Sequence, residues 1–425
     1  MNFKQPYNKD DFLNFIKDFL PSFDKDITDI NLSNSYKAIK KAKLIGRCDE
    51  LELSIFELQI EGKAEKKVYQ AKEGFKLMKE YQAYKALAVY FSEDDQNWRL
   101  SLMQMVPDRS ESGKIVQKFT NPRRYSFYLG PDAKTKTPEK FLKDEVRDFD
   151  DLLSRFSVEV VNKEFYREIA KYFRRLVGGD VKFGSKTEHF EPEMTLPSVD
   201  KGDKKTFQEF AVRLIGRIIF CWFLKQKKSD KDISLLPDEY LSTKAIENNS
   251  EYYHNILEKI FFQVLNRPVS QRSPELSNGY SKIPYLNGGL FDPHNDDYYD
   301  NQPNWALKIP NKWFLELFEV LETYNFTIDE NTVLDVDLSI DPEMLGRIFE
   351  NLLAEINPET GESARKSTGS YYTPRPIVEY MVDQSLIQYL LTKTNTGEDK
   401  IKALVSVDES DDEKFPLSSK EKEKV

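Results

Sequence analysis

Three side chains near the N-terminus have the types and spacing to hold a metal ion. Asp49 lies where a predicted strand ends, and Glu57 and Gln59 follow eight and ten residues later on the next predicted strand. Glu57 and Gln59 share a face because strand side chains repeat every two residues. Oxygen-bearing side chains are the ligands that hard cations such as Mg²⁺ prefer. We therefore predict a metal site at one sheet edge from Asp49, Glu57 and Gln59; Glu61-Gly62-Lys63, just beyond the strand, is a competing pattern.

The elements that must position these residues alternate between helix and strand. Apolar spacing and a stop at Pro21 predict an amphipathic helix over 10–20. The elements predicted after it are strands over 42–46 and 51–60, a lysine-rich helix over 64–84, and strands over 86–91, 98–102 and 121–131. This order predicts an α/β domain over 1–132, built as a mixed sheet flanked by helices.

The middle of the chain, 140–360, has mainly helical patterns. Apolar residues recur at i, i+3, i+4 and i+7 from Phe207 to Trp222, which predicts a long helix with a broad apolar face. Arg217 lies off that face, and Asp297 belongs to a polar loop that we expect to be solvated. We interpret this region as a helical connector domain.

A third segment, 361–394, contains a helix start. Thr373 is a suitable N-cap and Pro374 suits the first helical turn, while Tyr371 and Tyr372 precede them. Two rings beside a helix N-terminus suit a small polar ligand with a flat ring; the alternative is an ordinary capped helix with two packed tyrosines. Residues 395–425 are rich in Lys, Asp, Glu and Ser, and we expect a mobile charged tail.

Composition bounds the class of protein. Two cysteines and three histidines exclude a disulfide framework and a zinc cluster, and no apolar stretch reaches membrane-spanning length, so we expect a cytoplasmic protein without membrane contact. The net charge of −10 argues against DNA binding by the whole surface. Residues 114–186 nevertheless hold 17 Lys and Arg against 11 Asp and Glu. That band is either a DNA track or a solvated helix surface.

Three runs, in order, resemble type IIG restriction-modification enzymes, which combine an endonuclease with an adenine-specific DNA methyltransferase. They are Ile283–Phe291, Asp341–Leu353 and Gly369–Pro374 with the helix behind it. The resemblance implies that Tyr371, Tyr372, Thr373 and Pro374 form one wall of an S-adenosylmethionine site, in the first part of a methyltransferase domain. It also implies double-stranded DNA as the partner and a role in phage defence.

The N-terminal domain resembles restriction nucleases of the Asp then Glu-x-Lys type. Such enzymes hydrolyse phosphodiesters with Mg²⁺, which neutralises the transition state and helps ionise the attacking water. The resemblance implies catalysis by Asp49, Glu57 and Gln59, with Asp49 and Glu57 as metal ligands, although Gln59 departs from the usual lysine. Lys66, Lys67, Arg123 and Arg124 are the predicted DNA contacts.

The chain lacks the glycine-rich loop and the Asn-Pro-Pro-Tyr run that a complete methyltransferase needs. We therefore expect the N-terminal part of a restriction-modification enzyme, a type II restriction endonuclease that does not transfer methyl groups alone and binds S-adenosylmethionine only with a complete methyltransferase domain. The alternative is a decayed nuclease that serves as a DNA-binding or scaffold subunit and docks a separate methyltransferase or specificity subunit.

Overall fold

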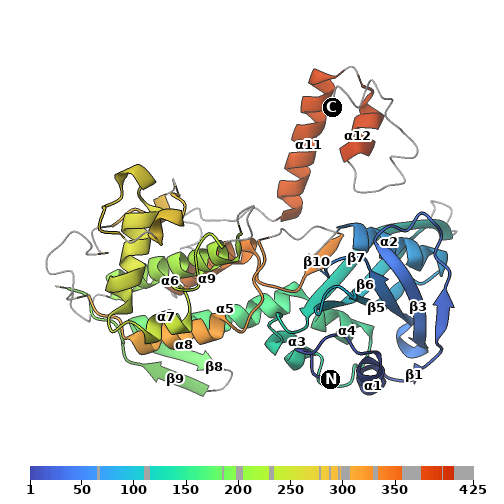
Figure 1. The fold of residues 1–425 in the computed structure, drawn as a ribbon, viewed down its shortest axis with the longest axis horizontal. Coiled ribbons are helices and arrows are strands. Elements are labelled where there is room, and N and C mark those ends of the chain that lie inside the picture. Colours follow the sequence, from blue (N-terminus) through green and yellow to red (C-terminus); the bar gives the residue numbers. More distant parts are fainter. Residues whose placement is uncertain are drawn as a thin grey trace. The chain divides into compact units, whose positions relative to one another are not determined.

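The structure is a computed structural model (Figure 1). It describes residues 1–64, 68–109, 115–183, 186–197, 204–228, 234–276, 279–286, 289–294, 297, 307–328, 334–356, 375–394 and 396–405. The chain divides into two compact units, Met1–Pro358 and Glu359–Val425. The predicted DNA contacts Lys66 and Lys67, and the predicted cofactor wall Tyr371, Tyr372, Thr373 and Pro374, lie outside the described residues.

The first unit is built on a mixed sheet, which has eight strands in the described part of the chain. The strands are β1 (Phe23–Asp24), β2 (Thr28–Ile30), β3 (Ile39–Cys48), β4 (Leu53–Ile60), β5 (Lys85–Phe91), β6 (Trp98–Arg109), β7 (Ile115–Leu129) and β10 (Asp335–Asp337). Their order is β1-β3-β4-β5-β6-β7-β10, with β2 also paired to β3. The pairs β4/β5 and β7/β10 are parallel, and the other pairs are antiparallel.

Both faces of this sheet are covered. Alternation along β4 sends Leu53 and Ile55 to one core and Phe56 and Leu58 to another. The first core is closed by α1 (Lys9–Phe19) and α4 (Phe149–Arg155), with α3 (Lys136–Phe141) before α4, and the second by α2 (Val68–Glu80). α1 begins at the N-cap Asn8, whose side chain accepts from the amides of the first helical turn. The predicted mixed sheet flanked by helices is therefore confirmed.

A mainly helical region follows and packs around its own large core. Its helices are α5 (Val158–Val177), α6 (Lys204–Gln226), α7 (Thr243–Glu247), the π-helices η2 (Tyr253–Leu257) and η3 (Lys259–Leu265), α8 (Asn311–Leu321) and α9 (Pro342–Ile356). The chain also has short 3₁₀ turns η1 (Asp49–Leu51), η4 (Val269–Gln271), η5 (Tyr280–Lys282) and η6 (Gly289–Phe291), and a hairpin of β8 (Gly179–Phe183) and β9 (Lys186–Phe190). The long helix predicted around Phe207–Trp222 is α6.

One loop of the helical region differs from its prediction. Asp297 is buried, with 2% of its surface exposed, and accepts two hydrogen bonds of 2.9 Å from Arg217 of α6. Arg217 also donates to the backbone oxygens of Leu290 and Asp292. Asp292 and His294 of this loop are exposed, as expected, but Asp297 is fastened to α6 by a buried ion pair. Burial of a carboxylate costs free energy unless a cation lies beside it, and the Arg217 guanidinium is that cation.

The second unit contains α11 (Arg375–Lys393) and α12 (Glu398–Val405). Ile401 of α12 is fully buried and packs with Ile387 and Leu390 of α11, so residues 398–405 form a helix where we expected the charged tail. This helix is stabilised because Ile401 buries its apolar side chain against α11, although the residues around it are mostly charged. No helix among the described residues is long and apolar enough to cross a membrane.

Candidate active site

Glu57 is the central acidic side chain of the predicted site. It lies in the middle of β4, and only 7% of its surface is exposed. The Tyr7 hydroxyl donates to one carboxylate oxygen and the Lys9 ammonium to the other, both at 3.0 Å. Lys9 is the first residue of α1, so the helix start determines where its amine lies. A carboxylate that is almost buried is thus stabilised by one cation and one neutral donor.

The Tyr7 ring explains how this group is held in place. The ring packs against Phe91 and Trp98, at centroid distances of 4.6 and 5.6 Å. Burial raises the pKa of the Tyr7 hydroxyl, and the negative charge of Glu57 raises it further. The hydroxyl therefore stays protonated and keeps donating to Glu57.

Gln59 lies two positions further along β4 and, as predicted, on the same strand face as Glu57. Its amide nitrogen donates to the Glu93 carboxylate at 2.8 Å. Glu93 is exposed and follows the end of β5, where Phe91 is the Cα partner of Gln59. The oxygen-bearing groups close to one another at this end of β4 are therefore Glu57, Gln59 and Glu93.

Asp49 does not join this group. It is exposed and opens the 3₁₀ turn between β3 and β4, where Cys48 and Leu53 are the last paired residues. Glu57 is four strand positions beyond Leu53, about 13 Å along β4. Two ligands of one Mg²⁺ must each approach it to about 2 Å, so Asp49 and Glu57 do not fit one ion. The predicted pairing of Asp49 with Glu57 is corrected by this geometry, because Asp49 lies in the turn whereas Glu57 pairs with Lys43, well away from the turn.

The two residues that pair with Glu57 across the sheet are not acids. They are Lys43 of β3 and Val89 of β5, and the Lys43 amine lies 3.1 Å from the Asp29 carboxylate. The competing acid Glu61 lies just past β4 and is mostly exposed, with an ion pair of 2.8 Å to Lys40. Among the described residues, no group of three or more His, Cys, Asp or Glu side chains is arranged to hold a metal. A metal here would rely on Glu57 and Gln59 with water ligands.

The two predicted arginine contacts separate onto opposite faces of β7. Arg123 is exposed, whereas Arg124 has 0% of its surface exposed and donates two hydrogen bonds to Asp335 of β10, at 3.0 and 2.7 Å. A fully buried guanidinium cannot reach a phosphate, so the prediction for Arg124 is corrected. Its role is to join β10 to the sheet.

A second buried pair strengthens that junction. Arg99 of β6 donates to Asp337 of β10 at 3.1 Å and to the Ala64 backbone oxygen at 2.7 Å. Sequence reasoning missed Tyr7, Lys9 and both aspartates of β10, because each acts on a partner far away in the chain and no local pattern signals such pairing.

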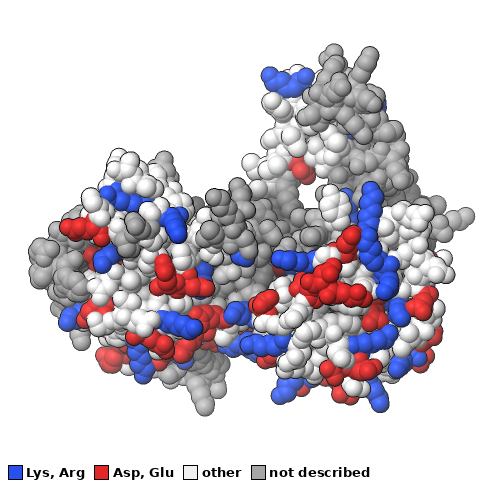
Figure 2. All heavy atoms as spheres, viewed as in Figure 1, with Lys and Arg blue, Asp and Glu red and all other residues white. Residues whose placement is uncertain are grey.

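Among the described residues, the face drawn in Figure 2 shows no continuous basic track of the kind that binds DNA. Over the described residues on that face, basic and acidic side chains are interspersed. Several cations of the band 114–186 are paired, including Lys140 with Glu164 and Arg155 with Asp151. Binding of DNA here would depend on individual exposed cations such as Arg123.

Comparisons with known proteins cover parts of the chain. A family model described as a domain of unknown function (DUF7814) matches residues 195–302, which include α6 and the π-helices. Over 250 residues the chain is 31% identical to a Methanocaldococcus jannaschii protein named "Putative type II restriction enzyme and methyltransferase". The match covers 54% of this chain and 19% of that protein, so the chain spans about a fifth of the relative's length. No solved structure matches. The chain is thus related in part to a protein named as a restriction-modification enzyme.

Proposed function

We propose that the chain acts on double-stranded DNA, in the cytoplasm, as the N-terminal part of a type IIG-like restriction-modification enzyme. The relative carries both activities in its name, and the three sequence runs point to the same class. In this proposal the sheet is the nuclease-like part and the helical region is the connector. The S-adenosylmethionine wall at Tyr371–Pro374 acts only with a complete methyltransferase domain.

The proposed reaction is metal-dependent hydrolysis of a DNA phosphodiester centred on Glu57. The observation that carries it is a nearly buried carboxylate on a central strand, with the Lys9 ammonium at 3.0 Å and an amide two positions on. Each carboxylate oxygen has two lone pairs, so Glu57 can keep its Tyr7 and Lys9 bonds and still offer an oxygen to an ion. Glu57 and Gln59 would hold Mg²⁺, which supplies charge neutralisation at the phosphate.

Lys9 is the residue that this proposal adds. The nuclease pattern has a lysine where this chain has Gln59, and Lys9 brings an ammonium to the same carboxylate from α1. In that position it would orient the attacking water and stabilise charge on the phosphate. Asp49 has no role in the proposed centre.

A second candidate function rests on the same carboxylate. Glu57 already has a cation and a donor on its two oxygens, and neither of its cross-strand neighbours, Lys43 and Val89, is an acid. This arrangement is stable without metal. It favours a decayed nuclease that binds DNA or serves as a scaffold for a separate methyltransferase subunit.

Cleavage of supercoiled plasmid with Mg²⁺ or Mn²⁺ distinguishes the two. The full chain is compared with Glu57→Gln and with Asp49→Asn, a matched change on the exposed turn. The nuclease proposal expects cleavage by the wild type and Asp49→Asn, and none by Glu57→Gln. Equal cleavage by all three contradicts the Glu57 centre, and metal-independent DNA binding without cleavage supports the second candidate.

A further inference from the structure

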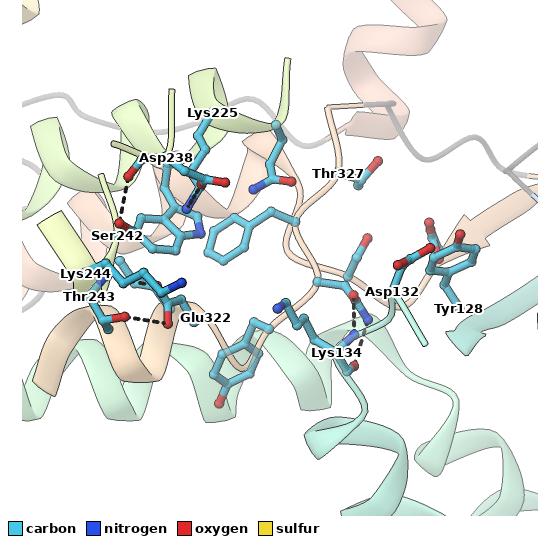
Figure 3. Close-up of a pocket in the computed structure, with 18 of the residues that line it drawn as sticks. Tyr128, Asp132, Lys134, Lys225, Asp238, Ser242, Thr243, Lys244, Glu322 and Thr327 are labelled. Carbon is cyan, nitrogen blue, oxygen red and sulfur yellow. Dashed lines mark hydrogen bonds and ion pairs between the residues drawn. The ribbon is translucent and has the colours of Figure 1, made fainter. Parts of the chain in front are cut away.

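A cavity of about 810 Å³ lies between the sheet and the helical region of the first unit. The sheet side contributes Tyr128 and the loop after β7, and the helical side contributes the ends of α6 and α8 and the start of α7. Figure 3 shows Lys134 and Tyr128 on the sheet side and Lys244 and Thr243 on the helical side. Pockets of this size hold small-molecule ligands. The cavity does not include Glu57 or Gln59.

Two acids of the lining are neutralised by cations of the same lining. Asp337 is paired with Arg99 at 3.1 Å, and Asp238 is paired with Lys225 at 2.7 Å. Both pairs connect different elements, so they also hold the walls together. The Asp337 charge is thus buried with its partner, and the exposed Asp238 charge is offset by Lys225.

The other two acids hold backbone segments in place. Glu322 accepts from the backbone amide of Thr243 at 3.2 Å and so fixes the start of α7. Asp132 accepts from the Asn97 amide at 2.9 Å, and Asn97 in turn accepts from the Asp132 backbone amide. The carboxylates of Glu322 and Asp132 therefore already accept hydrogen bonds from the protein itself.

Two cationic groups of the lining are available to a ligand. The exposed amines of Lys134 and Lys244 make no ion pair with a described residue. The Ser339 hydroxyl of the same lining has no hydrogen-bond partner among the described residues, but its oxygen is buried and does not face the open part of the cavity. Two ammonium groups on the walls of one cavity suit a ligand with several oxygen acceptors.

The lining also offers partly exposed aromatic rings. Tyr128 and Phe326 are half-buried, and both line the cavity. The Arg99 guanidinium lies 5.1 Å from the centroid of the Tyr128 ring, and Trp222 lies 6.3 Å from Phe326. Phe165 and Phe223 also pack against Phe326, so both rings are held in fixed positions. Each ring is only partly buried, and its exposed part offers a surface for a flat group.

We propose that this cavity binds a nucleotide, with Lys134 and Lys244 on its phosphates and Tyr128 or Phe326 against its base. Phosphate oxygens suit the free ammonium groups, and a base suits the rings. The nucleotide is either a free nucleoside triphosphate or one unit of a DNA strand, since both present the same chemistry. The site is independent of the proposed nuclease centre, so it stands whether or not the chain cleaves DNA.

Isothermal titration of the full chain tests this site. The probes are adenosine triphosphate, inorganic triphosphate, adenosine and a short single-stranded oligonucleotide. The variants are Lys134→Gln and Lys244→Gln, and the matched control is Lys282→Gln, an exposed lysine outside the cavity. Circular dichroism checks that each variant is folded, which the exposure of both lysines leads us to expect.

Each cavity lysine should weaken nucleotide binding by about tenfold, the effect of one charge-assisted hydrogen bond, while the control leaves it unchanged. An effect on adenosine triphosphate identifies a free nucleotide, and an effect confined to the oligonucleotide identifies a DNA unit. Binding that is unchanged by both cavity lysine variants, or equally reduced by Lys282→Gln, overturns the proposal. Absence of binding by every probe to the wild type also overturns it.

Discussion

The guanidinium of Arg124 and the carboxylate of Asp335 form a two-pronged hydrogen-bonded pair in the interior of the sheet. The bonds are 3.0 and 2.7 Å, and the two side chains are 0% and 1% exposed. They are also Cα partners in the parallel pairing of β7 with β10. Burial acts to lower the pKa of Arg124, but the charge of Asp335 raises it overall, so the arginine remains a cation.

The first prediction concerns this pair. Asp335→Ala should cost about 3–5 kcal/mol of unfolding free energy, because it leaves Arg124 buried without its counter-charge. Urea unfolding followed by circular dichroism measures the loss. Arg347→Ala, which removes an exposed pair with Glu343, is the control and should cost less than about 1 kcal/mol. Similar losses of unfolding free energy for Asp335→Ala and Arg347→Ala would contradict a larger contribution from the buried pair.

The second prediction concerns Lys9. Lys9→Met should lower plasmid cleavage about 100-fold or more if its ammonium takes part in the reaction. Lys9→Met also removes the counter-charge of the nearly buried Glu57, so the thermal midpoint should fall, and cleavage is compared well below the midpoint of each variant. Lys17→Met, an exposed lysine on the same helix, should leave cleavage intact. If cleavage falls in proportion to the melting temperature in both Lys9→Met and Lys17→Met, Lys9 has a structural role only.

The third prediction separates the neighbouring arginines of β7. Arg123→Gln should weaken DNA binding and reduce the slope of log affinity against log salt by about 1, as expected for one phosphate contact. Arg123 is exposed, so folding should be unaffected. Fluorescence anisotropy over a salt series measures the slope, with Lys282→Gln as the comparison. An unchanged slope for Arg123→Gln would remove it from the DNA contacts.

The fourth prediction is a pH dependence from His254 of η2. Its Nδ1 lies 2.5 Å from Glu258 and its Nε2 lies 2.8 Å from the Leu307 backbone oxygen. The Leu307 oxygen accepts from Nε2, and a carboxylate at Glu258 accepts from Nδ1 when the ring is an imidazolium, so this pocket favours the protonated ring. Burial lowers the pKa of His254, but the hydrogen bonds to Glu258 and Leu307 raise it overall.

A raised pKa in the folded state fixes the sign of this effect. The stabilisation is complete below the unfolded value of about 6.5 and is lost as the pH rises through the folded pKa. Melting temperature measured from pH 6 to pH 9 should therefore contain a falling step. Glu258→Gln should flatten that step, and a step that survives unchanged in Glu258→Gln would assign it to other groups.

Local patterns predicted much of the fold. Period-two alternation located β4 and β6, a continuous apolar run located β5, and apolar spacing located α1 and α6, because each signal depends on neighbours within a few residues. The alternation of side chains along a strand also contains information that our prediction for Arg123 and Arg124 did not use. Adjacent residues on a strand point to opposite faces, so Arg123 and Arg124 cannot both face solvent on a covered sheet.

The candidate site was less predictable. Glu57 and Gln59 share a strand face as expected, but the pairing of Asp49 with Glu57 depended on where the hairpin turns, which residue counts do not give. Lys9 reaches Glu57 across 48 residues, and Arg124 reaches Asp335 across 211. Such contacts are set by packing of distant elements, for which a single sequence has no periodic signal.

The late position of β10 bears on how the protein is made. A ribosome delivers β10 to the sheet 211 residues after Arg124, and at typical synthesis rates that interval is on the order of 10–40 s. During this time Arg124 of the nascent sheet has no counter-charge, because Asp335 has not yet been synthesised. The newly made N-terminal portion should therefore stay loosely assembled, and open to chaperones, until the helical region has emerged and returned the missing strand.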